Sequence, residues 1–188
     1  LSSPPVTDLA PPELSKLAYL GPTGTFTEQA LFTQGDLTQL DLRPAPSIPD
    51  VFRQVVAGEA DLGFAAIENS IEGSVNVTQD TLAFDVDLLI QREVVISIQL
   101  NLMVAPGTAL ADVERVCSYP HAIAQCRGWL SEHLPNAEVQ ATNSTADAAR
   151  LLAASPDGRT AAIAPGRAAA AYGLDVLAAD VEDHPENQ

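Results

Sequence analysis

Positive charge is scarce in this 188-residue sequence: nine Lys and Arg residues stand against 25 Asp and Glu residues, and the formal net charge is −16. Lys16 is the only lysine, and the arginines are scattered, so there is no basic stripe. A strongly acidic chain repels the phosphate backbone of nucleic acids and the surface of anionic membranes. We therefore expect no nucleic acid and no membrane among its partners.

Long apolar runs and cysteines are also in short supply. No run approaches the roughly 20 apolar residues that a membrane-spanning helix needs. The two cysteines, Cys117 and Cys126, are too few for a disulfide framework, and their spacing does not match a zinc knuckle. We expect both thiols to be reduced, as in a cytoplasmic protein. The sequence lacks a GxSxG motif, which argues against an α/β-hydrolase, and it shows no cluster of metal-ligating residues.

What the sequence does contain is an alternation of short apolar runs and helix-periodic segments. Residues 1–16 are rich in Ser and Pro, lack a signal-peptide pattern and are expected to form a flexible leader. The pattern then predicts strands over 17–20, 40–46 and 61–67, with helices from about 25 to 32 and from 47 to 58 between them. Strands and helices that alternate through short connections predict a largely parallel sheet.

A second series of the same kind begins at residue 113. Strands are predicted over 113–118, 139–142 and 160–164, and helices over 121–134, 145–154 and 165–172. The apolar-alternating segment 88–104 lies between the two series and is typical of extended chain that passes from one sheet to another. We therefore predict an α/β fold of two subdomains, the first built from residues 17–96 plus 174–188 and the second from residues 97–173. Clefts between such lobes hold small ligands.

Polar residues gather in loops that follow the predicted strands. Residues 21–25 precede a helix N-terminus, which favours an anion, although they lack the lysine of a P-loop and the third glycine of a dinucleotide fingerprint. Residues 143–145 form a helix N-cap pattern, and capping alone would also explain both segments. Residues 67–75 carry more polar groups than a plain loop needs, and Glu68 could be a buried acid or an anchor for Asn69. These residues predict a cofactor-free protein that binds a small polar or anionic ligand.

Five segments together closely resemble the prephenate dehydratase family of phenylalanine biosynthesis. They are LAYLGPTGTFTEQA, GFAAIENSIEGSVNVTQDTL, SYPHAIAQC, TNSTADAA and AAIAPGRAAAAYGLDVLAADVEDHPENQ, and the resemblance covers roughly residues 17–188. It implies two α/β subdomains arranged like a type II periplasmic binding protein, with the active site between them. It also implies a carbon–oxygen lyase that converts prephenate to phenylpyruvate, with loss of water and carbon dioxide and without metal or coenzyme.

The resemblance also assigns candidate site residues. By family position, the residues implied in catalysis are Asn69, Ser118 and Gln125. Those implied in substrate binding are Thr23, Gly24, Thr25, Glu68, Ser70, Gly73, Ser74, Ser144 and Thr145. The chemistry needs a proton donor near the departing ring hydroxyl and a rigid orientation of the substrate rather than a nucleophile.

Two departures from the family pattern carry expectations of their own. Tyr119, Pro120 and His121 stand where the family usually reads His-Pro-Gln. The sequence also stops before the family's Thr-Arg-Phe motif and its phenylalanine-binding ACT domain. We expect a truncated chain with weak prephenate turnover, for which phenylalanine is an allosteric ligand only if that domain is present. A homodimer or homotetramer is expected from the family.

Two alternatives remain open at this point. Arogenate dehydratase uses the same scaffold on the aminated substrate, and the sequence does not separate the two activities. A non-catalytic binding module, such as a solute-binding protein or the effector domain of a regulator, would share the lobes and the helix N-termini. The sequence shows neither an export signal nor a DNA-binding helix pair that would favour such a module.

Overall fold

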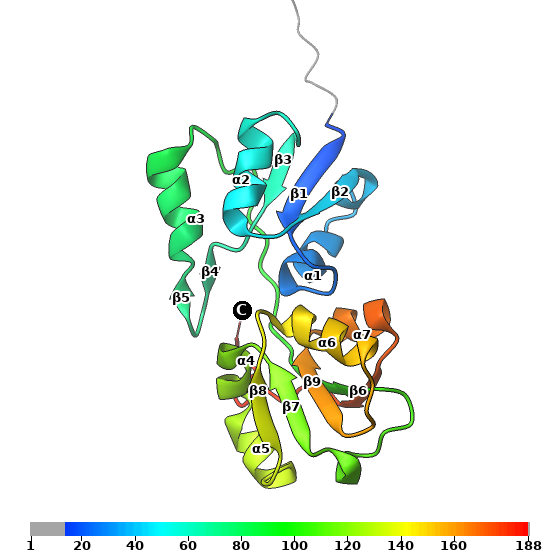
Figure 1. Cartoon of the computed structure of the whole chain (residues 1–188). Coiled ribbons are helices and arrows are strands. Elements are labelled where there is room, and N and C mark those ends of the chain that lie inside the picture. The colour runs from blue at the N-terminus through cyan, green and yellow to red at the C-terminus, as the bar shows by residue number, and fades with distance from the viewer. Residues whose placement is uncertain (1–13, 188) are drawn as a thin grey trace, which may run out of the picture.

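The computed structural model describes residues 14–187 and divides them into two α/β lobes joined by an extended segment (Figure 1). The expectation of two α/β subdomains is therefore confirmed. Most of the predicted leader, residues 1–13, lies outside the described residues. Ser15 and Lys16 already belong to the fold, because their backbone amides donate to the Asp61 carboxylate at 2.9 Å each.

The first lobe is built on a three-stranded parallel sheet. Strand β1 (Lys16–Leu20) lies between β2 (Asp41–Ala45) and β3 (Leu62–Phe64), and the connections carry α1 (Phe26–Phe32), η1 (Leu37–Gln39) and α2 (Ile48–Val56). Successive side chains of a strand point to opposite faces. Tyr19 therefore packs with Leu31 of α1, whereas Ala18 packs with Val51 of α2. The predicted parallel sheet is confirmed.

A short extension follows this sheet. Strands β4 (Glu68–Asn69) and β5 (Gly73–Ser74) form an antiparallel hairpin, and α3 (Asn76–Asp80) continues into a π-helical turn, η2 (Thr81–Asp85). Only three residues of the predicted strand over 61–67 pair with the sheet. Residues 86–100 then run to the second lobe without helix or strand, as the green trace in Figure 1 shows.

The second lobe holds a five-stranded sheet in the order β10-β6-β9-β7-β8. Its strands are β6 (Asn101–Val104), β7 (Arg115–Ser118), β8 (Glu138–Ala141), β9 (Thr160–Ala164) and β10 (Asp175–Ala178). Strand β7 runs parallel to β8 and β9, whereas β6 runs antiparallel to β9 and β10. The turn η3 (Leu110–Asp112) precedes β7.

Helices cover both faces of this sheet. Leu102, Val116 and Ile163 pack with residues of α4 (Pro120–Gln125) and α5 (Arg127–His133) on one face. On the other face, Met103 and Ala162 pack with alanines of α6 (Thr145–Ala154) and α7 (Gly166–Tyr172). Alanine side chains let these helices lie close to the strands. Among residues 14–187, none of the helices combines the length and the apolar character that crossing a membrane requires.

The prediction that residues 174–188 belong to the first subdomain is wrong for the strand that they contain. Strand β10 pairs with β6 in the second sheet, and Val181 continues this contact through its amide, which donates to the Leu100 carbonyl at 2.8 Å. Helix α7 packs on the second sheet and ends at Tyr172, and two residues span about 7 Å at most. The strand must therefore join the sheet on which α7 already lies.

The predicted helix over 121–134 is divided at Cys126, which has non-helical dihedral angles of φ −112° and ψ 14°. A residue distant in sequence explains the division. The Asp183 carboxylate accepts from the amides of Gly128 and Trp129 at 2.9 and 3.2 Å, and the Asp183 amide donates to the Gln125 carbonyl at 2.6 Å. The C-terminal segment after β10 (Asp175–Ala178), which contains Asp183, thus ends α4 and caps the start of α5.

Candidate functional site

The two lobes meet where the β4–β5 hairpin faces α4, with the end of the described chain between them (Figure 1). The side chain of Asn187 joins the two sides. Ser70 Oγ in the hairpin donates to Asn187 Oδ1 at 3.1 Å, and Asn187 Nδ2 donates to Gln125 Oε1 at the end of α4 at 3.2 Å. The structure therefore brings together two sequence-predicted site residues, Ser70 and Gln125, from different lobes.

A second contact crosses the same gap. His121 Nδ1 lies against the carboxylate of Glu72, which belongs to the hairpin turn, and both side chains are exposed. The ring of Tyr119 stacks on His121, with ring centroids 5.2 Å apart and an interplanar angle of 12°. Of the residues that replace the family's His-Pro-Gln, His121 thus contacts the other lobe, and the Tyr119 ring packs against it.

Asn69 shapes the hairpin turn rather than facing open solvent. Its Oδ1 accepts from the backbone amides of Ile71 and Glu72, at 3.0 Å each, and this fixes the loop that carries Ser70. Gly73 closes the turn with φ +82°, a conformation that favours glycine. Glu68 is exposed, so the possibility that it is a buried acid is wrong, and Ser74, which pairs with Glu68 across the hairpin, is exposed as well.

Ser118 lies behind the surface at the end of β7. Its side chain is fully buried, and Oγ donates to the Ile163 carbonyl at 2.6 Å. This bond ties β7 to β9 beneath the start of α4. The hydroxyl is therefore placed to hold the sheet rather than to meet a ligand in this conformation.

The loop of residues 21–25 packs against the second lobe at another place. Thr25 caps α1, because its Oγ1 accepts from the Glu28 amide at 3.1 Å, and the same hydroxyl donates to the Leu20 carbonyl at the end of β1 at 3.1 Å. The Gly24 amide donates to Glu28 Oε2 at 2.8 Å, and the Thr23 carbonyl accepts from the Tyr172 hydroxyl at 2.7 Å. Both bonds of the Thr25 hydroxyl are local structural bonds, and the loop contacts α7 rather than Ser70 and Gln125.

The third predicted segment also forms a cap. Ser144 Oγ accepts from the Asp147 amide at 3.0 Å at the start of α6. Thr145 is the first residue of that helix and is partly exposed. Helix α6 lies in the second lobe on the side that faces α1 in Figure 1.

Sequence reasoning missed a charged cluster that joins the lobes through α1 and α7. Arg167 Nε donates to Glu28 Oε2 at 2.7 Å, and its guanidinium lies 3.5 Å above the centre of the Phe32 ring. The Glu28 side chain is only 4% exposed, and its Oε1 accepts from the Tyr19 hydroxyl at 3.0 Å. Burial, together with this bond to Glu28, raises the pKa of Tyr19 to about 12. No local sequence pattern around Glu28 or Arg167 predicts that the two residues pair, because they lie 139 residues apart.

A cavity of about 540 Å³ lies beside this cluster. Its lining includes Phe32, Asn101, Arg167 and Asp180 but none of the predicted catalytic residues. A second hollow of about 670 Å³ lies between residues 21–23, residues 44–46 and the end of α7. Both hollows lie on the α1–α7 side, and neither is lined by residues of the β4–β5 hairpin or of α4. Within residues 14–187, no three His, Cys, Asp or Glu side chains are grouped so that they could hold a metal ion.

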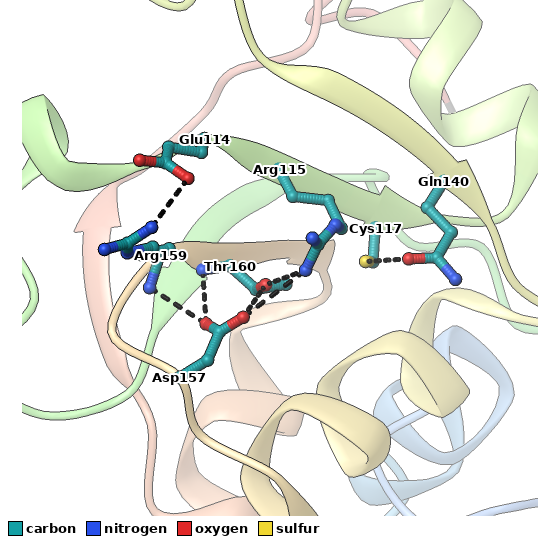
Figure 2. Close-up of polar contacts among 7 residues, drawn as sticks. All are labelled: Glu114, Arg115, Cys117, Gln140, Asp157, Arg159 and Thr160. Atoms are coloured by element: carbon teal, nitrogen blue, oxygen red, sulfur yellow. Dashed lines mark hydrogen bonds and ion pairs between the residues drawn. The ribbon is translucent and has the colours of Figure 1, made fainter.

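A separate polar network lies at the opposite end of the second sheet, where β7 and β9 begin (Figure 2). Asp157 Oδ1 accepts from the amides of Arg159 and Thr160, and its Oδ2 accepts from Thr160 Oγ1 at 2.8 Å and from Arg115 at 3.3 Å. Arg159 also pairs with Glu114 at 3.3 Å. This network holds the loop between α6 and β9, away from the contact between the lobes.

Comparison with known proteins covers the whole of both lobes. The family profile described as prephenate dehydratase matches residues 17–188. A bifunctional chorismate mutase/prephenate dehydratase of Neisseria gonorrhoeae is 45% identical over 171 residues, which are 91% of this chain and 47% of the relative. A prephenate dehydratase of Mycolicibacterium gilvum is 43% identical over 180 residues, with 90% of this chain and 57% of the relative covered.

A solved structure agrees with these sequence matches. The crystal structure of prephenate dehydratase from Arthrobacter aurescens in complex with L-Phe has a TM-score of 0.84 at 40% identity, with 91% of this chain and 56% of that chain covered. The chain spans about half the length of the curated relatives it matches. The match extends over both lobes. It includes the β4–β5 hairpin, α4 and the C-terminal segment that joins the hairpin to α4. On this evidence the chain belongs to the prephenate dehydratase family.

Proposed function

We propose that this chain carries the catalytic lobes of a prephenate dehydratase and that the site lies between the β4–β5 hairpin and α4. The observation that carries the proposal is the bridge from Ser70 in one lobe through Asn187 to Gln125 in the other. Each of these residues belongs to a segment that resembles the family, and the family profile covers all of them. A site made of two lobes can enclose a small substrate.

The proposed reaction makes modest chemical demands on such a site. The ring carboxylate of prephenate leaves as carbon dioxide, and the electron pair of the broken carbon–carbon bond makes the ring aromatic. This expels the 4-hydroxyl group, which takes up one proton and leaves as water. Because aromatisation drives the step, the site needs to orient the substrate and supply a proton rather than form a covalent bond.

The three residues that the resemblance implies in catalysis have different roles in this proposal. Gln125 is partly exposed at the end of α4, where its amide can contact the substrate. Asn69 acts through the loop that it shapes, and Ser118 acts through the β7–β9 contact beneath α4. Ser70, Gly73 and the exposed Glu68 and Ser74 would form the hairpin side of the site. Residues 23–25 and Ser144 with Thr145 would contribute through the lobe contact and the start of α6.

The activity is tested by adding prephenate to the purified chain and measuring phenylpyruvate by its ultraviolet absorbance in alkali. We expect phenylpyruvate to form at a low rate, and Gln125→Ala should lower kcat/KM by about a further tenfold to a hundredfold because it removes an orienting group. Gln39→Ala, at an exposed position in the first lobe, is the matched control and should leave kcat/KM unchanged. Measurable binding of prephenate without any product would contradict the proposal and favour a binding module, whereas a higher kcat/KM for arogenate would reassign the substrate.

We further propose that the protein is cytoplasmic and assembles into a homodimer or homotetramer. Cys117 and Cys126 are both free and buried, which suits a reducing compartment.

The proposed assembly is supported by exposed apolar side chains. Phe84, Leu89, Ile90 and Val95 are 63–82% exposed in one segment, and a partner copy would bury such side chains. Light scattering on the eluting protein measures the assembly, and a monomer at micromolar concentration would contradict it. The L-Phe seen with the Arthrobacter relative is proposed as a regulatory ligand only for a protein that also carries the ACT domain.

A further inference from the structure

Asn187 is a buried polar residue at the contact between the lobes. It is 1% exposed, and each of its amide atoms has a protein partner: Oδ1 accepts from Ser70 Oγ, and Nδ2 donates to Gln125 Oε1. Its backbone carbonyl accepts from the Ile98 amide at 2.8 Å. One residue therefore contacts the hairpin of the first lobe, α4 of the second lobe and the segment that connects them. Buried polar side-chain atoms in folded proteins generally have hydrogen-bond partners, and both amide atoms of Asn187 follow this rule.

The direction of the bond to Gln125 has a chemical consequence. A glutamine side chain presents a carbonyl oxygen, which only accepts, and an amino group, which only donates. Asn187 Nδ2 can only donate, so it selects the oxygen of Gln125. The amino group of Gln125 is thereby left to donate elsewhere, and within the described residues 14–187 it has no hydrogen-bond acceptor.

We propose that Asn187 is a positioning residue that fixes the orientation of the Gln125 amide, so that its amino group donates to an oxygen atom of the substrate. This inference rests on the proposed function. The oxygens that change during the proposed reaction are those of carboxylates and a departing hydroxyl, all of which accept hydrogen bonds. A Gln125 side chain turned by half a rotation would present its carbonyl oxygen to them, and attraction would become repulsion.

Asn187→Asp is the sharpest test, because it keeps the shape and the acceptor for Ser70 but removes the donor for Gln125. The introduced carboxylate favours the rotated Gln125, whose amino group can then donate to it. We expect kcat/KM for prephenate to fall at least tenfold. Asn136→Asp adds the same charge on an exposed turn before β8 and should leave kcat/KM unchanged.

A double-variant comparison separates positioning from simple charge repulsion or loss of structure. If Asn187 acts through Gln125, Asn187→Asp should cost little more when Gln125→Ala is already present, since contacting residues show non-additive effects. The neutral variant Asn187→Ala, with Gln125 present, should also lower kcat/KM. Fully additive losses, with folding intact by circular dichroism, would overturn the inference.

A second measurement does not depend on activity. The side-chain amino group of Gln125 gives a pair of nitrogen-15 NMR signals, which are identified by their loss in Gln125→Ala. We expect Asn187→Asp to shift these signals and slow their exchange with water, while Asn136→Asp leaves them in place. Unchanged signals in Asn187→Asp would refute the positioning role alone, whereas absence of phenylpyruvate from the unaltered chain would refute the proposed function alone.

Discussion

A single buried hydroxyl, that of Tyr19, links the sheet of the first lobe to the charged cluster around Glu28. The hydroxyl donates to Glu28 Oε1 at 3.0 Å, and the Tyr19 side chain lies in the core between β1 and α1. Ionising it would place a second negative charge beside a buried carboxylate. Burial and this neighbour therefore raise the pKa of Tyr19 to about 12.

The raised pKa of Tyr19 predicts a loss of stability at high pH. Because the pKa in the folded chain lies above the value of about 10 in the unfolded chain, the neutral phenol stabilises the fold fully below pH 10, and this contribution is lost as the pH rises toward 12. Urea unfolding between pH 8 and 11.5 should show a fall in the free energy of unfolding of about 2 kcal/mol that Tyr19→Phe lacks. An identical fall in Tyr19→Phe would show that other groups cause it.

At the scale of the elements, one glycine before α1 and one at the end of α7 both have a positive φ, but only the first is also crowded by a neighbouring helix. Gly24 has φ +90°, and a Cβ atom there would lie 3.0 Å from Ala168 Cα in α7. Gly173 ends α7 with φ +66° and has open space around it. We expect Gly173→Ala to lower the free energy of unfolding by about 1 kcal/mol.

Gly24→Ala should cost more, about 2–4 kcal/mol, because it adds the crowding against α7 to the same kind of strain. Chemical denaturation of both variants measures the difference. Equal effects would mean that α7 can move away from the loop of residues 21–25 at no cost, and the contact between the lobes would then be loose.

The loop between α6 and β9 depends on Asp157, whose carboxylate accepts the four hydrogen bonds drawn in Figure 2. The Arg159 amide, followed by the Thr160 hydroxyl, lowers the pKa of Asp157. The folded pKa lies below the unfolded one, so this stabilisation is present above about pH 4 and is lost as the pH falls through the folded value.

Asp157→Ala should therefore lower the free energy of unfolding by about 1 kcal/mol at pH 7, a small value because the side chain is largely exposed. The difference between the variant and the unaltered chain should shrink when unfolding is measured at pH 3. Asp87→Ala removes an exposed carboxylate elsewhere and serves as the control. A difference that stays constant with pH would mean that Asp157 contributes through its shape rather than its charge.

At the scale of the whole molecule, the pair of Glu28 and Arg167 holds α1 of one lobe against α7 of the other. Arg167→Met would leave the Glu28 carboxylate buried without its cation, and an uncompensated buried charge is costly. We expect a loss of about 2–3 kcal/mol, less than the roughly 3–5 kcal/mol of a fully buried pair, because the arginine is 30% exposed. Glu28→Gln combined with Arg167→Met should recover part of it. Small-angle scattering should detect wider separation of the lobes in Arg167→Met, and an unchanged radius of gyration would contradict this role.

Much of each lobe follows from local patterns. The helix predicted over 145–154 is observed as α6 with the same bounds, because Ser144 supplies a cap and the alanines supply a buried face. The helix predicted over 165–172 is observed as α7 (Gly166–Tyr172), which ends at a left-handed C-cap, Gly173. The parallel sheet of the first lobe follows from alternating strands and helices joined by short connections.

The contacts between distant segments were not predictable in this way. No local pattern indicates that Asp183 divides the helix over 121–134, because the effect comes from bonds across more than 50 residues. The same holds for the candidate site: the resemblance pointed to Ser70 and Gln125, but the role of Asn187 between them became visible only in the folded chain.

The sequence by itself determined the family, the α/β class and the segments from which the site is drawn, because motifs and hydrophobic periods are local properties of the chain. The tertiary structure alone decided that β10 joins the second sheet, that Ser118 is buried, and that Glu28 meets Arg167. These outcomes depend on which surfaces are close enough to pack and which buried polar atoms need partners. Both conditions are set by the whole molecule rather than by any one segment.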